Sequence, residues 1–331
     1  MCASDGYVID VLGPYYANTN DAKILEELLN ENQDFQNLLS TGDVFVLDRG
    51  FRDVVSKLEE SGYRVLMPAL KGQRKQLSTA ESNHSRRVTL LRWVVEAVHG
   101  IIGQKFKLLH HQLDNRLLPK AGTYCKIACF LINHFGKRLI STSAEDEEIM
   151  NRVKSQNFDE NTLASEVAEG RWSRRSSLFQ PLTSADVQDF PELTERDLTI
   201  FFTGTYQFQQ AISYLAEMMD ENDQINLEYL KERHDIIKIK SRSRHVNENT
   251  YNCYIHYNPD SIGYSSILRY CCECANGLRT IGCCSQVAAV VYYLSHARYL
   301  SKIIRPAEKL SKIFESTNVQ PIINEDSDED C

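Results

Sequence analysis

The chain has 331 residues, 42% of them hydrophobic, which is enough material for about two domains. Its formal net charge of −8 excludes a uniformly basic nucleic-acid binder but allows local basic patches. The N-terminus lacks the basic start and apolar core of a signal peptide, and no apolar run approaches the roughly 18 residues of a membrane span. No membrane partner is therefore expected.

The first part of the chain alternates between strand and helix patterns. Residues 7–11 follow an Asp-Gly turn signal and predict a strand. Asp21 is placed to N-cap a helix, and residues 44–47 form an apolar run that predicts a buried strand. A helix over about 52–61 and a short strand over 64–67 follow. Strands that alternate with helices predict an α/β layer structure.

A long helix comes next in this part of the chain. Ser78 and Glu81 form a capping box that predicts its start. Arg92 and Glu96 lie four residues apart, the spacing at which helical side chains meet. Apolar residues recur at spacings of three and four and give one apolar face: Val88, Leu91, Val95, Val98 and Ile102. A further helix, over about 120–138, is expected to bury Cys125, Cys129, Ile132 and Phe135.

Two carboxylates in these elements are candidate metal ligands. Asp48 directly follows the apolar strand, and Glu96 lies inside the long helix. Metal-dependent nucleases use such carboxylates to hold a divalent cation over a phosphodiester, and Mg²⁺ prefers these hard oxygen ligands. Each residue also has a plainer interpretation. Asp48 can be a turn former next to Gly50, and Glu96 can be the surface partner of Arg92.

Several spaced motifs resemble those of DDE-superfamily transposases of the PIF/Harbinger and IS5 type. The matching segments, in chain order, are 5–15, 20–22, 47–51, 83–87 and 92–100. The resemblance covers about residues 1–140. It implies an RNase H-like fold, with a central mixed sheet flanked by helices, and a nuclease that uses Mg²⁺ or Mn²⁺ on DNA.

The resemblance also implies roles for individual residues. It places Asp48 as the second catalytic acid, Glu96 as the third, and Asp21 at a recurrent non-catalytic acidic position. In such transposases the first catalytic Asp lies on the first strand, tens of residues before the Asp-Gly-Tyr segment. Neither Asp5 nor Asp10 matches it. We therefore expect an N-terminally truncated core that lacks this strand, as a decayed relic or a piece of a longer protein, and that is inactive as it stands.

The second half of the sequence predicts a separate and smaller α+β unit. A polar segment over 141–189, part of it helical, is expected to link it to the first unit. The unit itself is expected over 190–315, with helices over 193–198 and 206–219. An acidic stretch over 316–331 follows and is expected to be disordered.

Two basic groups are candidates for contact with DNA. Residues 236–245 alternate strictly, which predicts a strand with one basic face. The members of this face are Lys238, Lys240, Arg242 and Arg244. The second group is close in sequence to the proposed active site and includes Arg86, Arg87 and Arg92. Such surfaces can follow a phosphate backbone, although solvated strand and helix faces carry similar charges.

Five of the ten cysteines lie between Cys271 and Cys284. A reducing compartment is the default here, so these thiols are expected to be free or metal-bound. Cys272 and Cys274 precede an Asn-Gly hairpin signal, and Cys284 lies near the start of an apolar helix over 287–300, where a thiolate is favoured. A hairpin and a helix start can surround Zn²⁺ with four ligands, which favours metal over buried free thiols.

The same stretch, over about 250–300, resembles a SWIM-type zinc finger, whose pattern is Cys-x-Cys, a spacer and Cys-x-His. Cys272, Cys274 and Cys284 match the first three ligands, and Gln286 occupies the histidine position. Because glutamine is a poor Zn²⁺ ligand, we expect a degenerate finger with weakened zinc binding or a substitute fourth ligand. The nearby substitutes are Cys271, Cys283 and His296.

These features predict a transposase-derived, DDE endonuclease-like protein that binds DNA, Mg²⁺ or Mn²⁺, and Zn²⁺. The resemblance implies ancestral phosphodiester cleavage and strand transfer, with a homo-oligomer or a partner DNA-binding subunit. The alternative is a non-catalytic, domesticated protein that binds nucleic acid or protein through its zinc finger, or an inactive fragment. A nuclear location is inferred from the role.

Overall fold

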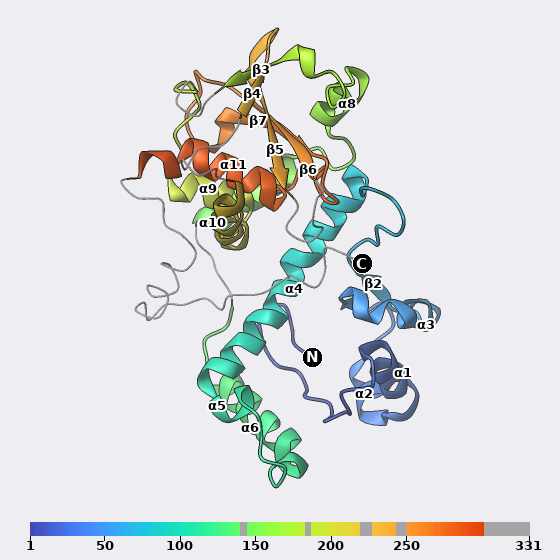
Figure 1. Cartoon of the computed structure of the whole chain (residues 1–331). Helices are drawn as coiled ribbons and strands as arrows, with labels where there is room; N and C mark the ends of the chain where they lie inside the picture. Colours follow the sequence, from blue (N-terminus) through green and yellow to red (C-terminus); the bar gives the residue numbers. More distant parts are fainter. Residues whose placement is uncertain (140–143, 183–186, 219–226, 243–249, 301–331) are drawn as a thin grey trace. The chain divides into compact units, whose positions relative to one another are not determined.

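Figure 1 shows a computed structural model of the chain, which describes residues 1–139, 144–182, 187–218, 227–242 and 250–300. The described residues form two compact units. The N-terminal unit consists of Met1–Leu70 and the described residues from His84 to 139. The C-terminal unit consists of Lys71–Asn83 and the described residues from 144 onward. A short segment that the sequence analysis placed in the first domain therefore belongs to the second unit.

The N-terminal unit is mainly helical. Its helices are α1 (Asp21–Glu31), α2 (Gln33–Leu38), α3 (Val55–Glu60), α4 (Thr79–Lys105, which starts in the C-terminal unit), α5 (Lys107–His110) and α6 (Ala121–Phe135), with 3-10 turns η1 (Arg49–Val54) and η2 (Leu118–Lys120). Strands β1 (Val44–Val46) and β2 (Arg64–Leu66) pair in parallel. Leu25, Phe35, Val54 and Leu58 form the apolar cluster that joins α1, α2, η1 and α3.

Local signals in the sequence set the starts of α4 and α1. Ser78 and Glu81 form the expected capping box: the Ser78 N–H donates to the Glu81 carboxylate at 2.9 Å, and the Glu81 N–H donates to the Ser78 hydroxyl at 3.2 Å. Asn20 caps α1 instead of Asp21, because its side chain accepts a hydrogen bond from the Lys23 N–H. The expected apolar face of α4 is only partly buried, since Leu91 is 50% exposed.

The strand predicted over residues 7–11 is wrong. Only an isolated bridge between Cys2 and Val8 forms there. The Asn133 side chain on α6 accepts a hydrogen bond from the Val8 N–H at 2.9 Å and donates one to the Val8 carbonyl at 2.8 Å. A side-chain amide thus satisfies backbone groups that a neighbouring strand would otherwise pair. Among the described residues of this unit, β1 and β2 form the whole sheet, so the RNase H-like fold is not confirmed.

The C-terminal unit contains a five-stranded antiparallel sheet in the order β3-β4-β5-β6-β7. Its strands are β3 (Phe179–Leu182), β4 (Leu227–Leu230), β5 (Arg233–Arg242), β6 (Thr250–Tyr257) and β7 (Ile267–Cys272). Its helices are α7 (Ala144–Ser155), α8 (Thr162–Glu169), α9 (Glu195–Phe202), α10 (Thr205–Met218) and α11 (Ser285–Ser295), with 3-10 turns η3 (Ser176–Leu178), η4 (Tyr264–Ser266) and η5 (Ala297–Tyr299). The overall class is mixed α/β, as expected.

Helices cover both faces of this sheet (Figure 1). On one face, α9, α10 and α11 pack against side chains such as Ile237 and Ile255 in the largest apolar cluster. On the other face, Leu163 of α8 packs against Ile236 and Tyr254. Successive strand residues point to opposite faces, so adjacent residues such as 236 and 237 enter different clusters.

The segment over 141–189 is more than the polar linker that we expected. It supplies α7, α8 and β3, the edge strand of the sheet. The Asn161 side chain caps α8 and also donates to the Tyr270 carbonyl of β7 at 2.8 Å, which ties the segment to the sheet. Its polar composition hid a few large apolar residues, Leu163, Val167 and Phe179, that are buried. The acidic stretch over 316–331 lies outside the described residues.

Candidate functional site

Asp48 and Glu96 converge on one cationic group in the N-terminal unit. Asp48 follows β1 and caps η1, since its Oδ1 accepts a hydrogen bond from the Gly50 N–H at 2.8 Å. The Arg92 guanidinium lies 3.5 Å from Asp48 Oδ2 and 3.1 Å from Glu96 Oε1. The Arg92 side chain is 13% exposed and the Glu96 side chain is 20% exposed, so this ion-pair network is largely sheltered from water. The two sequence-predicted carboxylates therefore share a site.

The two carboxylates fit a divalent cation, because both direct hard oxygen atoms toward the place that the Arg92 guanidinium occupies. The plainer interpretations hold at the same time, since Asp48 does serve as a turn former and Glu96 does pair with Arg92. Within the described part of the chain, no third His, Cys, Asp or Glu forms a compact ligand cluster with these two. The geometry therefore fits one partly coordinated cation, with Arg92 beside it.

A second cluster brings three cysteine sulfurs together in the C-terminal unit. Cys272 ends β7, Cys274 lies in the following turn, and Cys284 is the N-cap residue of α11. Their Sγ atoms all lie within 4.8 Å of one another, and all three residues are buried. Four sulfurs at Zn–S distances of 2.3 Å are about 3.8 Å apart in a tetrahedral site. This three-sulfur cluster therefore fits Zn²⁺.

The electrostatics of the three-sulfur cluster favour a thiolate at Cys284. Burial opposes ionisation there, but hydrogen bonds from the Cys272 and Cys274 thiols and from the Val287 N–H lower the pKa of Cys284, and the charge of Arg279 acts in the same direction. The Val287 N–H belongs to the first turn of α11, where backbone donors point outward and stabilise negative charge. The expectation of a favoured thiolate at a helix start thus has a specific structural cause.

The turn that carries Cys274 is held by residues far away in the sequence. The Gln76 side-chain amide donates to the Cys272 carbonyl at 2.6 Å and to the Cys274 carbonyl at 2.7 Å. A Cβ atom at Gly277 would collide with the Cys272 carbonyl, so this position requires glycine. The expected Asn-Gly turn is present, but no strand follows it in the described residues up to 300, so the expected hairpin is not seen there. Sequence reasoning missed Gln76, because nothing local links it to the cysteines.

Two of the three substitutes for a fourth zinc ligand are placed elsewhere. Cys271 points to the opposite face of the sheet, where it packs with Tyr254 near α8. His296 ends α11 and has its Nδ1 atom 3.1 Å from the Leu193 carbonyl oxygen. With a rise of 1.5 Å per residue, about 18 Å of helix separates it from Cys284. Neither residue can complete the three-sulfur cluster in this fold.

The basic face predicted on β5 is largely covered. Lys238 is 3% exposed, its Nζ lies 2.7 Å from the Glu228 carboxylate, and it stacks 4.5 Å above the centre of the Phe179 ring. The alternating pattern does form a strand, but the face that carries Lys238 is the one that α8 covers. Lys240 is exposed, the Arg242 side chain is not among those described, and Arg244 lies outside the described residues.

The basic group near the carboxylates is also less open than expected. Arg86 is 4% exposed, and Arg92 is engaged with Asp48 and Glu96. Arg87 is exposed on α4. Of the basic residues named above, Arg87 and Lys240 are therefore those whose described side chains are exposed.

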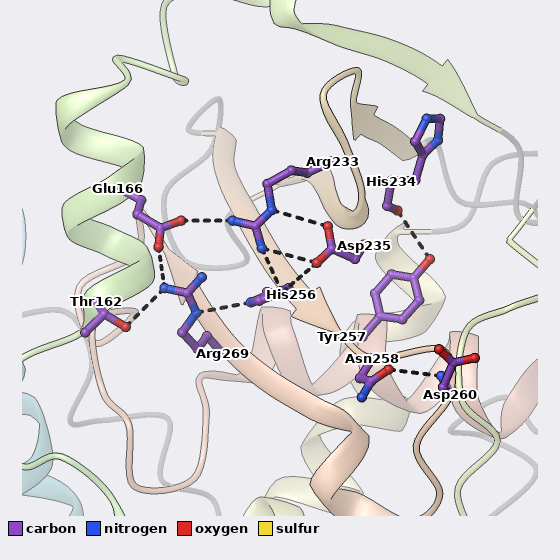
Figure 2. A network of polar contacts seen from close by, with 10 residues as sticks. All are labelled: Thr162, Glu166, Arg233, His234, Asp235, His256, Tyr257, Asn258, Asp260 and Arg269. Carbon is purple, nitrogen blue, oxygen red and sulfur yellow. Dashed lines mark hydrogen bonds and ion pairs between the residues drawn. The ribbon is translucent and has the colours of Figure 1, made fainter.

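Figure 2 shows a polar network on the sheet that the sequence did not reveal. Glu166 of α8 pairs with both Arg233 of β5 and Arg269 of β7. His256 of β6 lies between the two arginines, and its Nε2 atom is 2.7 Å from the Asp235 carboxylate. These residues come from four elements, and only the strand register brings them together. The network links α8 to the sheet.

The network holds His256 in its neutral form. The Arg269 Nε–H donates to His256 Nδ1 at 3.1 Å, so that ring nitrogen accepts, while Nε2 lies 2.7 Å from Asp235 Oδ2 and 2.8 Å from Arg233 Nη2. Burial lowers the pKa of His256 below its usual value; the charges of Arg233 and Arg269 act in the same direction, while Asp235 opposes them. A protonated imidazole would lose the hydrogen bond from Arg269 and face two guanidinium groups.

A pH dependence of stability follows from this neutral histidine. The pKa of His256 in the folded chain lies below the unfolded value, so its contribution to stability is present above about pH 6.5 and is lost as the pH falls through the folded pKa. Thermal unfolding of the C-terminal unit should therefore shift to lower temperature from about pH 7.5 to about pH 5.5. His256→Gln should flatten this slope, and His234→Gln, at an exposed histidine on the neighbouring strand β5, is the matched control. An unchanged slope in His256→Gln would contradict the assignment.

Comparison with known proteins finds a similarity for the N-terminal part of the chain. Residues 1–133 match the sequence model of a family described as DDE superfamily endonuclease. The match covers less than half of the 331 residues, so it shows a similarity of this N-terminal part to a DDE endonuclease family. No curated protein and no solved structure matches the chain. No helix in the described ranges has both the length and the apolar character needed to span a membrane.

Proposed function

We propose that this protein is a transposase-derived, DDE endonuclease-like protein of the PIF/Harbinger type, which acts on DNA in the nucleus. The observation that supports this function is the convergence of Asp48 and Glu96 on a single guanidinium, inside the segment that matches the endonuclease family. Asp48 follows a strand and Glu96 lies on a helix, 48 positions later in the sequence. Both carboxylates nevertheless contact the guanidinium of Arg92. A divalent cation is the group that such a pair of carboxylates holds in a nuclease.

In this proposal Asp48 and Glu96 are the protein ligands of Mg²⁺ or Mn²⁺. When bound, such an ion supplies Lewis-acid activation of a phosphodiester. Arg92 keeps the two carboxylates at the same place when no ion is bound, and its guanidinium can move toward a DNA phosphate, for which it has matching geometry. The exposed residues Arg87 and Lys240 are candidates for further phosphate contacts.

We also propose that the C-terminal unit is a SWIM-like zinc-binding module that helps the protein to grip DNA. The supporting feature is the three-sulfur cluster, whose residues have the Cys-x-Cys and downstream Cys spacing of such a finger. A structural ion there would fix the end of β7 relative to the start of α11. The proposed cofactors are thus Mg²⁺ or Mn²⁺ at the carboxylates and Zn²⁺ at the sulfurs.

Mn²⁺ binding tests the carboxylate site directly. Asp48→Asn and Glu96→Gln should each weaken Mn²⁺ binding to the full chain by about tenfold or more, because a two-carboxylate site loses half of its charged oxygen ligands. Isothermal titration calorimetry measures this effect. Asp53→Asn is the matched control, since this neighbouring carboxylate is exposed and pairs with Arg52. Equal Mn²⁺ affinity in all four proteins would refute the site.

A plasmid-nicking assay with Mg²⁺ then separates the two functional classes. Nicking that is lost in Asp48→Asn and in Glu96→Gln supports an active endonuclease. DNA binding without nicking, with Mn²⁺ affinity still dependent on both carboxylates, supports a non-catalytic descendant of the same enzyme. Absence of both DNA binding and metal binding would contradict the proposed function as a whole.

A further inference from the structure

The three-sulfur cluster needs a fourth ligand, and the sequence position that should supply it holds Gln286. The usual structural zinc site has four protein ligands, and an amide side chain is a poor one. Gln286 is buried in the first turn of α11. A fourth sulfur close to the cluster would satisfy the ion without this residue.

Cys253 is the thiol in this position. It lies on β6 directly opposite Cys272 in the β6–β7 register, and the two sulfurs are 3.3 Å apart. Opposed residues of an antiparallel pair point to the same face of the sheet, so Cys253 projects toward the cluster side. It is fully buried in the same apolar cluster as the three sulfurs, between the sheet and α11.

The geometry points to Cys253 as the fourth sulfur of this zinc site, which would make it a Cys₄ site with one ligand from the neighbouring strand. This inference rests on the proposed zinc binding by the three-sulfur cluster. The separation of Cys253 and Cys272 is close to the S–S distance of about 3.8 Å in a tetrahedral Zn–sulfur site. The Cys274 N–H lies 3.4 Å from the Cys272 sulfur, a contact that orients and stabilises a metal-bound thiolate.

The alternatives from the sequence fit less well. Cys271 points to the other face of the sheet, and His296 lies at the far end of α11. Neither Cys253 nor Cys283 belongs to the set of sulfurs that all lie within 4.8 Å of one another. Cys253 is favoured because its sulfur lies 3.3 Å from that of Cys272, on the strand paired with β7. Gln286 occupies the position of the finger's histidine. Cys253, on the adjacent strand and outside the Cys-x-Cys motif, would supply the missing ligand in its place.

Zinc affinity of the full-length protein tests the assignment. The wild-type chain should carry about one Zn²⁺, measured by mass spectrometry of the metal after purification without chelator. Cys253→Ser should weaken Zn²⁺ binding by more than about tenfold in competition with a chromogenic chelator, because the ion loses a protein ligand. Cys271→Ser is the matched control: this thiol is equally buried on the adjacent strand but faces away, so its loss should leave the affinity unchanged.

Co²⁺ in place of Zn²⁺ reports which atoms coordinate the metal. The sulfur-to-cobalt charge-transfer absorption of the wild type should correspond to four sulfurs and should fall by about a quarter in Cys253→Ser. Gln286→His in the Cys253→Ser background should restore affinity, with the visible bands shifted toward those of a three-sulfur, one-nitrogen site. This rescue shows that a folded site remains when Cys253 is absent.

Specific outcomes would overturn the assignment. One is an unchanged Zn²⁺ affinity in Cys253→Ser. Another is a loss of cobalt absorption in Cys283→Ser instead of Cys253→Ser. A third is mass spectrometry under non-reducing conditions that shows a disulfide between Cys253 and Cys272. If Cys253→Ser leaves Zn²⁺ affinity unchanged while Cys272→Ser abolishes metal binding, the zinc function stands without Cys253. If the wild type binds neither Zn²⁺ nor Co²⁺, both the zinc function and this assignment fail.

Discussion

Chelation of zinc from the full chain should unfold the C-terminal unit. The three-sulfur cluster joins the end of β7 to the start of α11, and every residue of α11 is buried. Structural zinc sites contribute about 10 kcal/mol or more of apparent binding free energy, which is comparable to the whole stability of a typical domain. Loss of the ion would remove the bonds that hold the three sulfurs together, and α11 would lose this anchor to the sheet.

Near-ultraviolet circular dichroism and hydrogen exchange measure this loss. The tyrosine-rich core of the C-terminal unit should lose its fixed environment after treatment with a zinc chelator, and the amides of β6 and α11 should exchange faster. Zn²⁺ should restore both signals, and Mg²⁺ should not. Cys272→Ser should reproduce the chelated state, with Cys125→Ser, a partly exposed thiol on α6 of the N-terminal unit, as the control. A chelated chain with unchanged exchange would exclude a structural zinc.

Features that depend on a few neighbouring residues could be predicted from the sequence. The capping box at Ser78 set the start of α4, and the alternation over residues 236–242 marked β5. The i, i+4 pair of Arg92 and Glu96 forms an ion pair as its spacing indicated. In each case the interaction energy comes from within a helical turn or a single strand, so the local sequence contains the information.

Features that depend on which element covers which face could not be predicted in the same way. Lys238 was placed on the correct face of β5, but that face is covered by α8, from a segment that looked like a linker. Cys253 carries no motif, and only the β6–β7 register places it opposite Cys272. A one-residue change of register would have turned the cysteine to the other side of the sheet. Tertiary pairing decides such positions.

Removal of the Asn83 side chain should strongly destabilise the C-terminal unit, because this side chain makes four long-range hydrogen bonds. Asn83 is completely buried on the first turns of α4. Its side-chain oxygen accepts hydrogen bonds from the Thr280 and Ile281 N–H groups at 2.9 and 3.0 Å. Its side-chain nitrogen donates to the Phe158 carbonyl at 2.9 Å and to the Thr280 hydroxyl at 2.8 Å. One amide thus fixes the spacer between the Cys-x-Cys motif and Cys284.

Asn83→Ala should lower the free energy of unfolding of the C-terminal unit by about 3 kcal/mol or more, because it leaves two backbone N–H groups and a carbonyl without partners at a buried site. Denaturant unfolding measures this value. Asn83→Asp should be milder, since a carboxylate still accepts from both N–H groups but cannot donate to Phe158. Asn37→Ala, at an exposed asparagine of α2, is the control and should be neutral within about 0.5 kcal/mol.

The same substitution should also weaken zinc binding, and this second effect separates a local role from a general one. Thr280 and Ile281 lie a few residues before Cys284, so a loose spacer would let Cys284 move away from the other sulfurs. Because a metal site tolerates only small displacements of its ligands, we expect a loss of about tenfold in Zn²⁺ affinity in Asn83→Ala. A destabilised variant with wild-type zinc affinity would show that the sheet and α11 alone position the cluster, and that Asn83 contributes only to stability.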